Sequence, residues 1–498
     1  MHPTLRAAIV ASLMAWAPTA SHAADVTPEQ AHTLEGQIRG WLASMAGPDL
    51  PVAASPIQVT PAGDHFLLTY PPARAAAPAN PWPTTTANAR PAEGGTWALD
   101  SIHIQTPATF TVDMPVPAKP GEPARPPVPT TYILNYATQD GGGTWDPALA
   151  TPSVINLAYT GCELAAANAN SRQVTTIDRL NSATTLRPVA GGRVDAAFDV
   201  TGTGYSLRTT VTSPAAEVPA FQLAARQVKV ALAIAGISRE RSAQVIPALT
   251  RFTPQPGRPP GTKPSPGTKP SPSPEAIRAV IQAMQGLASG MTLTEVLDDF
   301  TVSSSGVNVA STQFRLGLEA KADGGFIRGA LDVGLDGLAL PGTGLDTFAD
   351  LLPHHVALRP YVSNVPTQEL LQLLQSQMEH REDRLPPAQV AALFGHGGLK
   401  AGLESFALDI GGASFAGKAS IDLPAPNAAS GTAQVTATDM DALLTTVQAN
   451  PSLAQAVPVI VFAKGIGRTE GGKLVWDMQF DSSKLLVNGV DLMKMTGR

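Results

Sequence analysis

The chain of 498 residues has little cysteine and few aromatic residues: Cys162 is its single cysteine, and aromatics make up 5%. One cysteine cannot form an internal disulfide, so the fold must be held together by its packed core. A reactive thiol needs a basic partner, and no histidine lies near Cys162 in the sequence. We therefore expect a buried or inert thiol at this position.

Charge is also scarce, since charged residues make up only 15% of the chain and the net charge is −6. This weakly acidic balance argues against a nucleic-acid-binding surface and against a polybasic contact with a membrane. Hydrophobic residues make up 43%, which excludes a wholly disordered chain.

No stretch is long and apolar enough to span a bilayer as a helix. The apolar run from Ala7 to Pro18 falls well short of the roughly 20 residues needed. Arg6 precedes this run, and Ser21-His22-Ala23 supplies the small residues of a cleavage site. The sequence predicts a signal peptide over 1–23, cleaved before Ala24, and hence a periplasmic protein. An uncleaved N-terminal anchor is the alternative.

Glycine (44) and proline (46) are abundant and indicate many turns and loops. The clearest break is the proline-rich segment 253–275, in which the hexapeptide Gly261–Pro266 is repeated at once. We interpret this segment as a linker or a loop. It would separate an N-terminal helix plus β-rich domain (24–252) from a C-terminal β-rich domain (276–498) that has a helical insertion at about 364–396.

The helix after the signal peptide is predicted to begin at Pro28, with Thr27 as its N-cap. Most of the remaining chain shows the two-residue period of strands. The pattern Gly-Gly-Thr-Trp, ending at Trp97 and at Trp145, predicts a glycine turn that leads into a strand with an inward tryptophan. Near the C-terminus Asn488-Gly489 predicts a tight hairpin.

A weak internal repeat links two strand-rich segments, because Leu297–Val302 resembles Leu403–Leu408 and similar strands follow each. The repeat indicates a duplicated β-meander. We therefore expect an α+β, β-rich fold: long curved antiparallel sheets with a few packing helices.

Motifs that resemble catalytic or metal sites are incomplete. Gly412–Lys418 lacks the Ser or Thr of a phosphate-binding loop, and Phe394–Gly398 has no matching nucleophile elbow. Zinc-ligand spacing is absent among the histidines His354, His355, His380 and His396. Adjacent carboxylates are expected to be solvated and to point apart, as in Asp298-Asp299 and Glu382-Asp383. We expect no catalytic residue, no metal and no cofactor.

The duplicated pattern over Phe300–Leu338, Phe406–Leu443 and Leu474–Val490 resembles the exported AsmA-like and YdgA-like domains of unknown function from Gram-negative bacteria. The resemblance implies long antiparallel sheets that curl into a groove, and a role in envelope maintenance, sometimes with lipid handling. Known members often keep an N-terminal membrane anchor, whereas this chain has an expected cleavable signal.

The resulting hypothesis is a non-catalytic periplasmic envelope protein that binds an apolar ligand or lipid in a sheet-lined groove. Its partners would be a lipid or another envelope protein, and not nucleic acid. The predicted lining consists of Leu316, Leu318, Leu331, Val333, Leu335, Trp476 and Met478, which could instead simply form the core. An outer-membrane β-barrel and an exported hydrolase are the alternatives.

Overall fold

The computed structural model describes residues 26–46, 57–70, 84–114, 128–212, 217–242, 244–245, 274–304, 306–342, 346–380, 387–481 and 484–492. The predicted signal peptide and residues 253–273 of the predicted linker lie outside these ranges.

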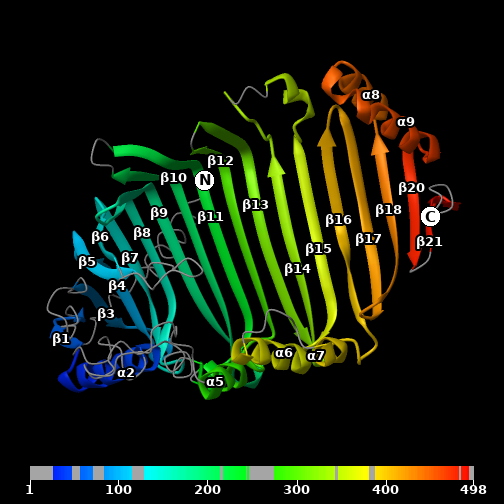
Figure 1. The fold of residues 1–498 in the computed structure, drawn as a ribbon. Helices are drawn as coiled ribbons and strands as arrows, with labels where there is room; N and C mark the ends of the chain where they lie inside the picture. The colour runs from blue at the N-terminus through cyan, green and yellow to red at the C-terminus, as the bar shows by residue number, and fades with distance from the viewer. Residues whose placement is uncertain are drawn as a thin grey trace, which may run out of the picture.

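One antiparallel sheet runs through the described chain, and its long strands lie side by side in chain order (Figure 1). Its N-terminal part pairs in the order β1 (Gln58–Ala62), β2 (His65–Tyr70), β3 (Thr85–Pro91), β4 (Trp97–Ile104), β7 (Thr138–Asp146), β8 (Thr151–Ala167), β9 (Ser171–Val189), β10 (Arg193–Thr212) and β11 (Glu217–Ser238). It continues as β12 (Gly290–Ser304), β13 (Val307–Asp323), β14 (Phe326–Asp336), β15 (His355–Pro366), β16 (Leu399–Ile410), β17 (Ala413–Ala425), β18 (Ala428–Thr438) and β20 (Lys473–Asp481).

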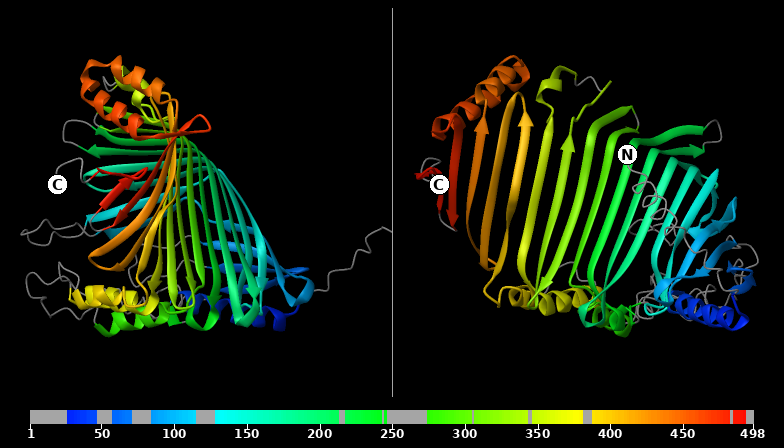
Figure 2. Two further views of the ribbon diagram at one scale, coloured as in Figure 1. Left: turned by 90° about the vertical axis from the view of Figure 1, so that its right-hand side faces the viewer. Right: turned by 180° about the vertical axis from the view of Figure 1, so that it is seen from behind.

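Short strands complete the sheet. The hairpin of β5 (Ala108–Met114) and β6 (Val128–Asn135) joins the second half of β8, and β19 (Arg468–Glu470) pairs with β20. At the C-terminus β21 (Lys484–Val487) and β22 (Val490–Asp491) form the predicted hairpin, with Asn488 and Gly489 at φ 48° and 83°. The sheet twists strongly from one end to the other and stays open (Figure 2).

The β-rich class is confirmed, but the sheets predicted in the plural are one sheet. Residues Gln222–Ala235 of β11 pair with Gly290–Ser303 of β12, so the sheet continues across the predicted domain boundary. The repeat corresponds to two three-stranded meanders, β12–β14 and β16–β18, each followed by a helical segment: η3 (Asp346–Leu351) and α8 (Met440–Gln448). The helical insertion contains α6 (Thr367–His380) and α7 (Pro387–Ala392).

The register gives the sheet two chemically different faces. Residues that pair directly across antiparallel strands point to the same side. We call one side the apolar face; from β10 to β15 it carries Ala196, Phe198, Val200 and Gly202; Val228, Val230, Leu232 and Ile234; Met291, Leu293, Glu295 and Leu297; Phe314, Leu316, Leu318 and Ala320; Gly329, Leu331, Val333 and Leu335; and Val356, Leu358 and Val362. The other side, the polar face, carries the intervening residues.

A kink crosses the sheet at one level of β8, β10 and β12. Gly161, Gly204 and Asp299 have positive φ values of 58°, 64° and 47°, and the residues that precede them share one row of the register. The side-chain alternation shifts by one residue at this level. The rings of Phe300 and Phe314 contact each other at 6.2 Å on the apolar face, although regular alternation would separate them. The shift keeps this face apolar along the bent strands.

Helices cover the two ends of the apolar face. The helix α2 (Pro28–Ala46) begins with reciprocal bonds between Thr27 and Gln30, as a capping box does. Its residues Ala31, Leu34 and Ile38 pack on β1–β4 and β7. At the C-terminal end α8, η4 (Pro451–Ala456) and α9 (Val457–Ile466) pack on β17–β20. The helices α5 (Pro274–Met284), α6 and α7 lie along one end of the long strands (Figure 1).

The prediction of a glycine turn before Trp145 is wrong. Gly142 and Gly143 lie inside β7, where a Cβ on Gly143 would approach the Val154 carbonyl oxygen to 2.1 Å. Glycine is needed there because two backbones come close together, and not because the chain turns. Trp145 itself is buried, as predicted, and pairs with Trp97.

Candidate functional site

Apolar side chains form a continuous row across the middle of the apolar face. A single row of directly paired side chains crosses β10 to β14: Phe198, Leu232, Leu293, Leu318 and Leu331. Phe198, Leu318 and Leu331 are 39%, 40% and 37% exposed. Large apolar side chains that are exposed singly are normal, but a contiguous row of them marks a site of interaction.

The helices do not cover this stretch within the described chain. The hydrophobic cluster under α2 draws its strand residues from β1–β4 and β7, and the cluster under α8 and α9 from β17–β21. None of the clusters formed by described residues includes a side chain of β10–β15. As far as the described residues go, the strands between the two covered ends therefore present an open apolar surface.

Five of the predicted groove residues come together on this open surface. Leu316 pairs with Val333 and Leu318 pairs with Leu331, while Leu335 lies one step further along β14. They form a block across two neighbouring strands. Their alternation in the sequence is what places them on one face.

Trp476 and Met478 lie on the same face but in a different environment. Trp476 is 6% exposed, and its indole N–H donates to the carbonyl of Ala463 in α9 at 2.8 Å. Met478 packs against the same cluster under α8 and α9. The structure therefore separates these two residues from the open block and places them in a packed core.

The polar face opposite the block carries a network of charges. The Arg359 guanidinium lies 2.7 Å from the Glu319 carboxylate and 3.5 Å from Asp332, and it also pairs with Glu404. A hydrogen bond from Lys321 lowers the pKa of Glu319, with further lowering by the charges of Lys321 and Arg359. These pairs keep the polar face compatible with water and distinguish it from the apolar face.

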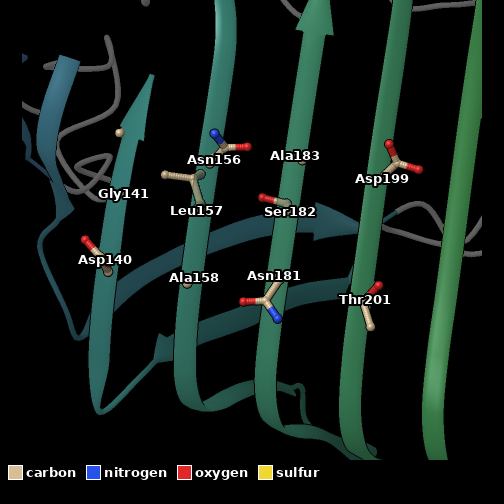
Figure 3. Close-up of a pocket in the computed structure, with 11 residues that line it drawn as sticks. Asp140, Gly141, Asn156, Leu157, Ala158, Asn181, Ser182, Ala183, Asp199 and Thr201 are labelled. Atoms are coloured by element: carbon tan, nitrogen blue, oxygen red, sulfur yellow. The ribbon is translucent and has the colours of Figure 1, made fainter. Parts of the chain in front are cut away.

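A shallow hollow of about 340 Å³ lies between β7 and β10. Figure 3 shows Asp140, Asn156, Asn181 and Asp199 on its four neighbouring strands. The strands that carry Asp140 and Asp199 are three spacings apart, about 14 Å, whereas the two carboxylates of a glycosidase lie within about 10 Å of each other. This hollow offers hydrogen-bonding groups but no acid–base pair.

Two of the histidines considered in the sequence have side-chain partners in the structure. His355 bonds Asp336 at 2.5 Å and His396 bonds Glu369 at 2.8 Å, and no metal-binding group of three or more His, Cys, Asp or Glu occurs in the described ranges. Burial raises the pKa of the Cys162 thiol, which makes it a poor nucleophile.

The expectation that Asp298-Asp299 forms a solvated edge is wrong for Asp298. Its side chain is buried and accepts a hydrogen bond from Gln313 at 2.9 Å, with Lys229 and Arg226 nearby. These partners lie on the neighbouring strands β11 and β13 and satisfy the buried carboxylate, although they are far from Asp298 in the sequence. Residues 381–386, which include Glu382-Asp383, lie outside the described ranges.

Sequence reasoning missed the extent of the open surface. Phe198, Leu232 and Leu293 were not among the predicted lining residues. The two-residue alternation over Val228–Ile234 is a signal that orients Leu232. Only the cross-strand register shows that these three residues continue the row of Leu318.

None of the described helices is long and apolar enough to cross a bilayer. No protein-family model matches the chain, and no curated protein matches it either. The resemblance to AsmA-like and YdgA-like domains therefore stays a prediction.

Proposed function

We propose that this protein is a non-catalytic factor of the bacterial envelope, exported to the periplasm, that binds the acyl chains of lipids along the open middle of its apolar face. The observation that carries the proposal is the apolar row from Phe198 to Leu331, continued by neighbouring rows of apolar side chains. Three side chains of this row are exposed, and the other two, Leu232 and Leu293, are half-buried.

The composition of this surface favours acyl chains over a protein partner. Protein interfaces typically combine an apolar centre with about one hydrogen bond per 100–200 Å². Here the rows above and below Leu318 again consist of aliphatic side chains, alanine and glycine, with Glu295 as the exception. An acyl chain needs no hydrogen-bond partners and gains about 25 cal/mol for each Å² of apolar surface that it removes from water.

The length of the strands supports the same ligand class. β13 has 17 residues and β11 has 22, at about 3.3 Å per residue. A strand of this length provides an apolar track that matches or exceeds an extended acyl chain. The polar face, with Arg359 and its carboxylate partners, remains in contact with water.

The test places one charge on each face. Leu318→Asp puts a carboxylate in the exposed row, and Thr292→Asp puts the same group on an exposed position of the polar face, since Thr292 pairs with Glu319. Binding of a fluorescent phospholipid, phosphatidylcholine with a cis-parinaroyl chain, is titrated for both variants and for the unmodified protein.

We expect Leu318→Asp to weaken binding by at least about tenfold, because the carboxylate must be desolvated under the chain, and Thr292→Asp to stay within about twofold. Circular dichroism and a thermal melt establish that both variants are folded. An unmodified protein that does not bind the phospholipid, or equal binding by the two variants, contradicts the proposal.

A further inference from the structure

Glu295 is the single charged side chain among the apolar-face residues of β10–β15 defined above. It lies in β12 between Leu293 and Leu297, which point to the same side. Across the neighbouring strands it pairs directly with Val230 and Leu316. A carboxylate is therefore framed by aliphatic side chains on every side within the sheet.

The Glu295 carboxylate forms no hydrogen bond or ion pair with the part of the chain that the structure describes. The carboxylates of the polar face differ in this respect, since Glu319 pairs with Arg359 and Lys321. The charge of Glu295 does affect Tyr205. Burial raises the pKa of the Tyr205 hydroxyl, and the negative charge of Glu295 raises it further.

Covering this surface changes the energetics of Glu295. In the open protein the half-buried carboxylate is hydrated. An acyl chain laid over Leu293 and Leu316 removes that water, and burying an unpaired charge is strongly unfavourable. A ligand that brings a positive charge with N–H donors to the same place replaces the lost hydration by a charge-assisted hydrogen bond.

We propose that Glu295 is a polar anchor that selects, for the open apolar face, amphiphiles whose head is an ammonium group over those whose head is a hydroxyl or a carboxylate. The inference rests on the proposed binding of acyl chains and specifies the ligand class. The ligand class follows from charge complementarity, because Glu295 is the one acidic side chain among the apolar-face residues defined above.

The experiment compares dodecylammonium, dodecanol and dodecanoate, which share one chain and differ only in the head. Each displaces the apolar fluorophore N-phenylnaphthylamine from the full-length protein at neutral pH. We expect the ammonium compound to bind at least about tenfold more tightly than the alcohol, with dodecanoate the weakest, because hydrogen bonds to charged groups contribute more than neutral ones.

Two variants isolate the anchor. Glu295→Gln keeps the shape and removes the charge, so the preference for ammonium over alcohol is expected to fall to within about twofold. Glu319→Gln removes a carboxylate from the polar face and is expected to keep the preference of the unmodified protein.

The outcomes separate this inference from the proposed function. If the unmodified protein binds all three compounds equally, or if Glu295→Gln keeps the preference, the anchor is overturned while acyl-chain binding stands. If none of the three compounds binds, the proposed function fails and the anchor fails with it.

Discussion

The covered ends and the open middle of the apolar face are built from the same kind of strand but have different surroundings. At the N-terminal end Leu34 of α2 is 0% exposed against strands that include Trp145. In the middle Leu318 of β13 is 40% exposed. The difference lies in what covers the strand and not in the strand itself.

This comparison teaches that two-residue alternation identifies a face without telling whether that face is a core or a binding surface. An antiparallel sheet readily has one packed and one hydrated face. Here α2, α8 and α9 pack on the ends of the apolar face, and the intervening strands leave it open. Substitutions in the two regions should therefore affect different properties.

The largest expected effect belongs to Trp145 at the covered N-terminal end. Trp145 is 2% exposed, contacts Trp41 edge to face, and donates its indole N–H to Gln37 at 3.2 Å. We expect Trp145→Ala to lower the free energy of unfolding by about 3–5 kcal/mol. Urea unfolding followed by circular dichroism measures this loss, and a change below about 1 kcal/mol would mean that α2 contributes no core.

One substitution made in both regions sharpens the comparison. Leu34→Ala removes a fully buried side chain and should lower the free energy of unfolding by about 2–5 kcal/mol. Leu318→Ala removes a side chain that already contacts water and should cost less than about 1 kcal/mol. Equal losses in urea unfolding would show that the middle of the face is packed like its ends.

The smallest expected effect comes from the polar face and depends on pH. The pKa of Glu319 in the folded state is lowered by its bond to Lys321, so its pairing stabilises the fold above the unfolded pKa near 4.5. This contribution is lost as pH falls through the lowered folded pKa. Thermal melts between pH 6 and pH 3 should fall less steeply for Glu319→Gln. The Lys321 partner is exposed and the Glu319 side chain is in partial contact with water, so the difference is small and shrinks in salt.

Much of the fold could be predicted from local patterns in the sequence. The cap at Thr27, the hairpin at Asn488-Gly489 and the alternation of Leu316 and Leu318 each depend on neighbours along the chain. The class and the duplicated meander follow from such signals.

The features that could not be predicted depend on the register between strands and on which helices pack over them. Both are set by residues far apart in the sequence. Nothing local distinguishes Trp476, which α9 buries, from Leu331, which stays exposed. Gly143 was interpreted as part of a turn because its close neighbour Val154 is set by strand pairing. The shift of alternation at Asp299 likewise needs the row of strands beside it.

The most direct test of the open face attaches an environment-sensitive fluorophore at a chosen cysteine. Cys162→Ser removes the native thiol, and Leu318→Cys or Thr292→Cys then places the label on the apolar or the polar face. We predict water-exposed emission at both positions in the free protein, and a blue shift at position 318 alone when dodecylammonium is added. Emission at position 318 that is already blue-shifted and unchanged by the ligand, or an equal shift at both positions, would contradict an open apolar face that binds acyl chains.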